Sequence, residues 1–176
     1  MKRHLVSAAL LTVVAAAAAA AAGGCRYNTT GSLPPELKTI AVARLRNESP
    51  TPGLEGEVTA AVITALQSQG RLELVGLGDK PDLILTGTID AYRRSSLRSD
   101  VYGDSVEFAL EVKATVNVRK ADGSDLLKKA RVSNLDNEPT SGQVRMTAGR
   151  TEAMGRAEAV EDLGRNIVRR IVNSGW

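Results

Sequence analysis

The alternation of apolar and polar residues between positions 106 and 118 is the feature that most constrains the fold. Side chains on a β-strand point alternately to its two faces, so a period of two predicts one buried face and one solvated face. The odd positions are polar apart from Ala109. This pattern is typical of an antiparallel strand in a sheet that is covered on one side only. The even positions are all apolar: Val106, Phe108, Leu110, Val112, Ala114, Val116 and Val118.

A tight turn and further strands surround this segment. Residues 121–124 read Ala-Asp-Gly-Ser, which favours a hairpin turn. On the returning strand, Leu126, Ala130 and Val132 are expected to continue the inward face. Upstream, residues 37–45, 71–76 and 82–92 predict three more strands, and the first of these is apolar on both faces, as in a covered position.

Two segments repeat apolar residues at helical spacing. For the first, Thr51 is the expected N-cap, Pro52 the first helical residue and Gly70 the stop. Its buried positions are expected to be Leu54, Val58, Ala61, Val62, Ala65 and Leu66. The second helix follows a loop over residues 135–150. Its expected buried side consists of Ala153, Ala157, Val160, Gly164, Ile167 and Ile171.

These elements predict an α+β fold, a two-layer sandwich in which two amphipathic helices pack on one face of a mixed sheet. The expected order is strand, helix, four strands, helix. The first strand, helix and second strand have short links, which implies a right-handed crossover to a parallel neighbour. We divide the chain into a signal peptide at 1–24, a polar tether at 25–36 and one domain at 37–176.

The N-terminus has the three parts of a secretory signal. A cationic start at Lys2 and Arg3 precedes an apolar run over 5–22, and small residues lead to the single cysteine, Cys25. A cysteine directly after such residues predicts cleavage before it and lipidation of its thiol. An uncleaved transmembrane anchor is the alternative. Arg26 stands where an aspartate commonly retains lipoproteins in the inner membrane, so we expect a lipid anchor in the outer membrane with the domain facing the periplasm.

The composition excludes several kinds of chemistry from the mature chain. The only histidine, His4, lies in the signal and the only thiol would be acylated, which leaves no side chains for Ser-His-Asp or Cys-His catalysis, for zinc sites or for disulfides. We therefore expect no enzyme, no cofactor and no metal, with a hydrolase built on paired carboxylates as a minor alternative. The formal net charge of +3 falls to about +1 once Lys2 and Arg3 leave, and aromatic residues make up 3% of the chain. Neither property suits a nucleic-acid partner.

Basic residues gather at two places that could recognise phosphate. One group follows the third expected strand and the other lies on the last. Guanidinium forks match phosphate oxygens, so contact with the phosphates of lipopolysaccharide is one interpretation. A solvated loop together with an edge strand protected by charge is the other. The candidate contact residues are Arg93, Arg94, Arg98, Lys128, Lys129 and Arg131.

A series of short segments resembles the LptE-type lipopolysaccharide-assembly lipoproteins. The series starts with Cys25-Arg26-Tyr27 and ends with residues 82–92, DLILTGTIDAY. Between them lie the segments GSLP (31–34), KTIAV (38–42), PGLE (52–55) and GRL (70–72), with Asn47 before PGLE.

The resemblance implies two helices on a mixed sheet, an anchor in the inner leaflet of the outer membrane, and a position as a plug inside an LptD-type β-barrel. It also implies help in folding that barrel, delivery of lipopolysaccharide to the outer leaflet, and lipid contact by basic residues near the ends of the sheet. Arg93, Arg94, Lys128 and Lys129 are the nearest candidates for that contact. Another envelope scaffold lipoprotein, curli-secretion-like or Tol-associated, is the alternative.

Overall fold

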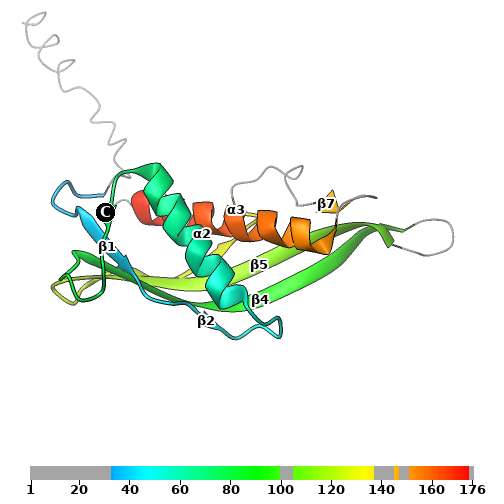
Figure 1. Cartoon of the computed structure of the whole chain (residues 1–176), viewed down its shortest axis with the longest axis horizontal. Coiled ribbons are helices and arrows are strands. Elements are labelled where there is room, and N and C mark those ends of the chain that lie inside the picture. The colour runs from blue at the N-terminus through cyan, green and yellow to red at the C-terminus, as the bar shows by residue number, and fades with distance from the viewer. Residues whose placement is uncertain (1–32, 100–104, 137–144, 147–150, 175–176) are drawn as a thin grey trace, which may run out of the picture. The chain divides into compact units, whose positions relative to one another are not determined.

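The computed structural model describes residues 33–99, 105–136, 145–146 and 151–174, and Cys25 lies outside them. Two helices cover one face of a single sheet (Figure 1). The strands are β1 (Thr39–Val42), β2 (Arg46–Asn47), β3 (Glu73–Leu74), β4 (Leu83–Ser99), β5 (Ser105–Lys120), β6 (Asp125–Ser133) and β7 (Arg145–Met146). The helices are α2 (Leu54–Gln69) and α3 (Glu152–Val172).

The predicted α+β class and element order are confirmed. The sheet runs β3-β1-β4-β5-β6, with β1 parallel to β3 and β4 and with β4, β5 and β6 antiparallel. Two additional strands of two residues each join it, β2 beside β4 and β7 beside β5. The loop expected over 135–150 therefore contains a short strand.

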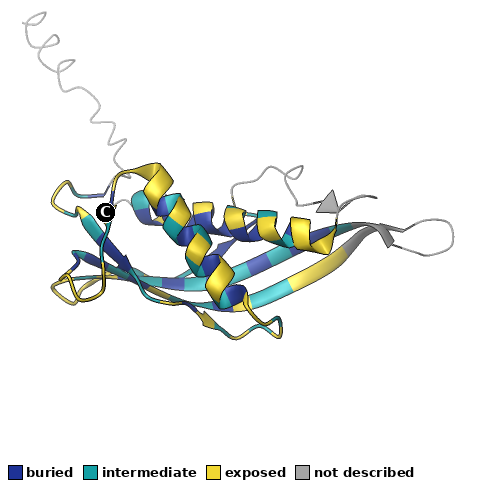
Figure 2. Ribbon diagram, viewed as in Figure 1, coloured by how far each residue is buried: buried dark blue, intermediate teal, exposed yellow. Residues whose placement is uncertain are grey.

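The alternation in β5 separates the two faces as predicted. Leu110, Val112, Ala114, Val116 and Val118 are fully buried beneath the helices, whereas the intervening side chains are only partly covered or exposed. The inner side of the sheet is accordingly dark in Figure 2, and the outward surfaces of both helices are not. This apolar face and the buried stripes of the helices form one core.

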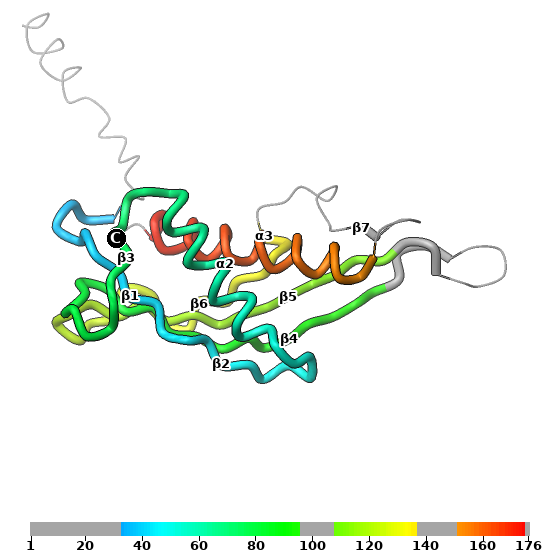
Figure 3. Tube along the Cα trace, viewed as in Figure 1, coloured from blue at the N-terminus to red at the C-terminus, as the bar shows by residue number. Residues whose placement is uncertain are grey.

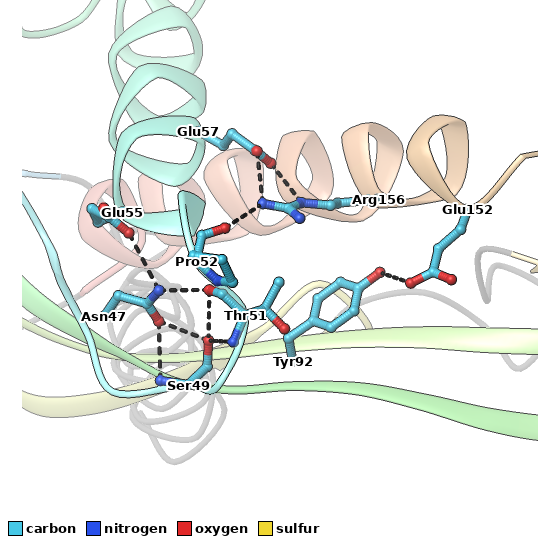
Figure 4. A network of polar contacts seen from close by, with 9 residues as sticks. All are labelled: Asn47, Ser49, Thr51, Pro52, Glu55, Glu57, Tyr92, Glu152 and Arg156. Carbon is cyan, nitrogen blue, oxygen red and sulfur yellow. Dashed lines mark hydrogen bonds and ion pairs between the residues drawn. The ribbon is translucent and has the colours of Figure 1, made fainter.

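The first helix begins two residues later than predicted. Gly53 has a left-handed backbone (φ 85°) and acts as the N-cap of α2, so Thr51 and Pro52 lie before the helix. Their carbonyls accept hydrogen bonds instead, from the amide of Asn47 at 2.7 Å and from the guanidinium of Arg156 at 3.1 Å (Figure 4). The helix ends as predicted, at a left-handed Gly70.

Strand lengths also differ from those expected from the sequence. The strand predicted over 71–76 is reduced to Glu73–Leu74, and the one predicted over 37–45 is reduced to β1, with β2 just beyond its predicted end. The strand predicted to end at Tyr92 continues as β4 to Ser99. Pairing with β5 explains that extension, because the antiparallel ladder continues through polar residues that carry no apolar signal.

The buried stripe of α3 is confirmed only from its third turn onward. Val160, Gly164, Ile167 and Ile171 are buried, whereas Ala153 and Ala157 are exposed. The stripe instead starts with Gly155, Ala159 and Leu163, which are spaced by four and lie on one side of the helix. Alanine and glycine are too small to mark a face by sequence alone, which accounts for the difference.

A buried amide extends the β5 ladder past the end of β6. The side chain of Asn134 accepts from the N–H of Val112 at 2.8 Å and donates to the carbonyl of Leu110 at 3.0 Å. Asn166 of α3 donates to the carbonyl of Ser133 at 2.9 Å. Buried polar groups are costly unless paired. These amides therefore join α3 to the end of β6 without leaving an unpaired group.

The carboxylate of Asp82 ties β1 to the start of β4. It accepts from the backbone N–H groups of Lys38 and Thr39 and from the Thr39 hydroxyl, each at 2.9 Å. These hydrogen bonds, with the Lys38 N–H foremost, hold the pKa of Asp82 below its ordinary value. The stability that they contribute is present at neutral pH and is lost as the pH falls through that lowered pKa.

The two helices cross where Gly164 meets Ala61. A Cβ added at Gly164 would lie 2.8 Å from the Ala61 carbonyl carbon and 2.9 Å from its oxygen. We predict that Gly164→Ala destabilises the domain by about 1–3 kcal/mol, because backbone atoms cannot move aside as a side chain would. Urea unfolding followed by circular dichroism measures the change.

Gly56→Ala in the first turn of α2 is the matched control, since nothing lies within 4 Å of the position of its Cβ. It should be neutral or stabilising by up to about 1 kcal/mol through helix propensity. Equal effects of the two substitutions would contradict the close crossing.

Candidate functional site

The face of the sheet turned away from the helices carries the candidate site. Side chains from β4, β5 and β6 line a hollow of about 510 Å³ on this face. Cross-strand pairing brings them together: Lys113 lies opposite Ala91 of β4 and opposite Ser133 of β6, and Thr115 lies opposite Arg131. The lining residues are Asp90, Ala91, Arg93, Lys113, Ala114, Thr115, Arg131, Val132, Ser133 and Asp136.

Three cations from three different strands converge on this hollow. Lys113 pairs with Glu111 at 3.0 Å. Arg93 and Arg131 are exposed and have no ion pair with any residue that the structure describes. We call this cavity, which Arg93, Lys113 and Arg131 line, the cationic hollow.

The two carboxylates of the hollow already accept hydrogen bonds. Asp90 accepts from the hydroxyl of Thr115 at 2.7 Å, and Asp136 accepts from the backbone N–H of Ser133 at 2.9 Å. Hydrogen bonds from neutral donors leave both carboxylates negatively charged, so these two groups and the three cations give the hollow a formal net charge of +1. An anion with several oxygens is therefore the ligand that suits this arrangement.

The predicted group of three arginines does not act as one cluster. Arg93 and Arg94 lie within β4, not in a loop after it, so their side chains point to opposite faces of the sheet. Arg93 faces the hollow. Arg98 lies opposite Glu107 in the backbone register, and its side chain is outside the described part of the structure.

Arg94 is engaged on the helical side. Its guanidinium lies 3.7 Å from the centre of the Phe108 ring and pairs with Glu152 at the start of α3 at 3.3 Å. Tyr92 donates to the same carboxylate at 3.3 Å (Figure 4). Burial, followed by the charge of Glu152, raises the pKa of Tyr92. These contacts connect β4 to α3. The role of Arg94 is therefore structural.

Of the basic residues predicted on the last strand, only Arg131 reaches the hollow. Lys128 pairs with Asp125 at 3.8 Å near the hairpin end of β6. Lys129 has a left-handed backbone (φ 49°), and its N–H donates to the Asn117 side chain at 2.8 Å. The irregular register here turns both lysines away from the three-cation group.

Sequence reasoning missed Lys113 as a candidate. It appeared only as one of the polar odd positions of the central strand. The hairpin at 121–124 was the available signal, because it sets β6 beside β5 and so places Arg131 and Lys113 on one face. Because the register between β5 and β6 is irregular, counting residues from the turn along the two strands does not predict that pairing.

A second hollow, of about 590 Å³, lies between the C-terminal halves of the helices. Its floor includes Ala61, Ala65, Val168 and Val172. Arg165 lines it too and is paired with Glu161 and Asp162. Arg169 is the only other cation among the lining residues, so this mainly apolar groove is the weaker candidate for an anion.

The described residues include no group of three or more histidine, cysteine, aspartate or glutamate side chains arranged to hold a metal ion. Within the same residues, no helix is both long and apolar enough to span a membrane.

Comparison with solved structures supports the fold. A PelC dodecamer from Paraburkholderia phytofirmans is similar at 12% identity, over 80% of this chain and 93% of that one, with a TM-score of 0.51. A Xanthomonas campestris protein is similar at 15% identity, over 77% and 84%, with a TM-score of 0.50.

Family comparison is more specific than these structural likenesses, which at such identities concern the fold alone. Among curated proteins, none matches the chain in sequence. A family model described as LptE, lipopolysaccharide-assembly, matches residues 37–171, which is nearly the whole domain predicted from the sequence. The chain therefore belongs to the LptE family of lipopolysaccharide-assembly proteins.

Proposed function

We propose that the protein is a non-catalytic lipoprotein of the outer membrane. In this proposal, acyl chains on Cys25 anchor it, the domain plugs an LptD-type β-barrel and assists its assembly, and it helps to deliver lipopolysaccharide to the outer leaflet. Family membership supports this role, as does the signal that precedes Cys25. The observation that carries the proposal is the cationic hollow on the helix-free face of the sheet.

The hollow has the chemistry that a lipid phosphate requires. A phosphate offers several anionic oxygens, and a guanidinium can donate two parallel hydrogen bonds to a pair of them. Arg93 and Arg131 approach from β4 and β6, on either side of Lys113 in β5. Strand pairing already places these cations on three adjacent strands, so contact with a phosphate group requires no rearrangement of the backbone. We propose that they contact the phosphates of lipopolysaccharide.

The same face suits a position inside a barrel. The interior of an outer-membrane barrel is polar, so a plug needs a polar wall. The side chains of Glu111, Lys113, Thr115 and Asn117 form such a wall along β5 and are half-buried. A polar face of this kind fits a lumen better than it fits lipid.

The alternative is another envelope scaffold, curli-secretion-like or Tol-associated. It would assemble into a ring or contact peptidoglycan-associated partners. Family membership over residues 37–171 favours the lipopolysaccharide role instead. No feature of the described residues favours the alternative specifically.

We predict that the double substitution Arg93→Ala and Arg131→Ala weakens lipopolysaccharide binding about tenfold or more, because each guanidinium contributes charge-assisted bonds to phosphate. Binding of purified protein to lipopolysaccharide and to its dephosphorylated form provides the measurement. The wild-type protein should prefer the phosphorylated form, and the double variant should lose that preference.

Arg169→Ala combined with Arg170→Ala is the matched control, since it removes two exposed arginines outside the hollow. Equal loss in the control would show that general positive charge, not the hollow, binds the lipid.

Cys25→Ser should abolish acylation, because only a thiol can form the thioether. Metabolic labelling with palmitate should mark the wild-type protein and not the variant, and the variant should leave the outer-membrane fraction. Two or three acyl chains hold a protein on a membrane almost permanently, at about 0.8 kcal/mol for each buried methylene. An unlabelled wild-type protein would refute the anchor.

Co-expression with the LptD-type barrel of the same organism should yield a stable complex of the two proteins. Depletion of the lipoprotein should lower the amount of folded barrel and of surface lipopolysaccharide. Both are measured in the same cells, by heat-modifiable electrophoretic mobility of the barrel and by surface labelling of the lipid. Normal barrel folding and normal surface lipopolysaccharide after depletion would overturn the proposed role.

A further inference from the structure

Beyond Ile89, one edge of β4 has no neighbour among the described residues. On the side away from β5, β4 pairs with β1 through residues 83–85 and with β2 through Thr88 and Ile89. The last contact on that side is the N–H of Glu48 donating to the Ile89 carbonyl at 3.0 Å. The chain then turns away toward α2 while β4 continues with β5 (Figure 3). We call residues 91–96 of this edge the open edge.

The backbone groups of the open edge can be assigned a direction. Tyr92 lies opposite Val112, and Arg94 lies opposite Leu110. Val112 and Leu110 use their polar backbone groups on their other side, with Asn134. In an antiparallel ladder both members of such a pair point away from each other. The N–H and C=O groups of Tyr92 and Arg94 therefore point outward from the sheet.

The two edges of the β4–β5 ribbon differ in whether their backbone groups have hydrogen-bond partners. Along β5, the Asn134 amide imitates a strand opposite Leu110 and Val112, and β7 pairs with Phe108 and Ala109. Along β4, the corresponding stretch presents its outward backbone groups to no strand that the structure describes. A row of unpaired backbone groups is a template for another strand.

Charge restricts which strand could pair there. Glu111, opposite Arg93, is paired with Lys113, so it does not neutralise the guanidinium of Arg93. Arg94 is paired with Glu152, so Arg93 is the cation that decides the charge of this edge. Two copies of this edge paired antiparallel would bring the Arg93 side chains of both chains together, and like charges in adjacent strands are unfavourable. A segment that carries acidic residues is complementary instead.

We propose that the open edge accepts an extended, acidic segment of the barrel partner by strand addition. Main-chain hydrogen bonds to Tyr92 and Arg94 supply the affinity, and acidic side chains beside Arg93 supply the selectivity. This inference rests on the proposed function, because the segment belongs to the barrel. Arg93 also faces the cationic hollow, so the segment and a phosphate would compete for its guanidinium.

Amide hydrogen exchange tests the backbone pairing directly, in the mature lipoprotein alone and in its complex with the barrel. The N–H groups of Tyr92 and Arg94 should become protected in the complex. Those of Arg93 and Ser95 point toward β5 and should change little, which gives an alternating pattern that general burial would not produce. Equal exchange at Tyr92 and Arg94 in the two samples would overturn the proposal.

Two pairs of variants test the same edge by affinity for the barrel. Ser96→Pro removes an outward N–H and should weaken the complex roughly three- to tenfold, while Ser96→Ala keeps that N–H and should not.

The second pair changes the charge at an exposed position. Ser95→Glu should weaken the complex about two- to fivefold relative to Ser95→Lys, because a carboxylate there repels an acidic segment. Unchanged affinity in Ser96→Pro and Ser95→Glu would refute strand addition while leaving barrel binding intact. If the wild-type protein does not bind the barrel, the proposed function itself is refuted.

Discussion

The two-faced central strand β5 is the constraint on which the rest of the structure depends. Its inner side chains, from Leu110 to Val118, are fully buried beneath the two helices. That layer can form only because α2 and α3 come close enough to cover it, at the contact between Gly164 and the backbone of Ala61. Burial of the inner face therefore determines where the helices lie, and it leaves the outer face as the only broad surface of the sheet that can meet another molecule.

The functional surfaces follow from this arrangement because they lie on the same strands as the core. Every second residue of β5 from Leu110 to Val118 supports the helical layer, and the residues between them form the polar wall and the base of the cationic hollow. Pairing with β4 and β6 then brings Arg93 and Arg131 to either side of Lys113. Since the hollow is part of the sheet, its cations are held by the ladder itself. The backbone at these three positions is fixed by strand pairing, so in the proposed function an anion would bind without first ordering a loop.

In the strand-addition proposal, the open edge of β4 gives the molecule a second means of recognition, through the backbone. The buried amide of Asn134 completes the β5 ladder, whereas the corresponding stretch of β4 has no partner among the described residues. Side-chain charge on the face and main-chain bonding at the edge would engage different chemical groups. One lipoprotein could in this way contact both a lipid phosphate and an extended polypeptide.

The sequence by itself determined the layers, the element order and the family resemblance, because alternation and helical spacing depend only on neighbours along the chain. It indicated the end of α2 at Gly70 but misplaced its start, since the left-handed Gly53 follows from a network with Asn47 and Arg156 that spans distant segments. Only the tertiary structure decided which cations act together. Arg93 and Arg94 are adjacent in sequence yet lie on opposite faces, while Lys113 and Arg131 become neighbours through strand pairing. Strand register depends on bulges and on long-range contacts, which a local sequence pattern does not predict.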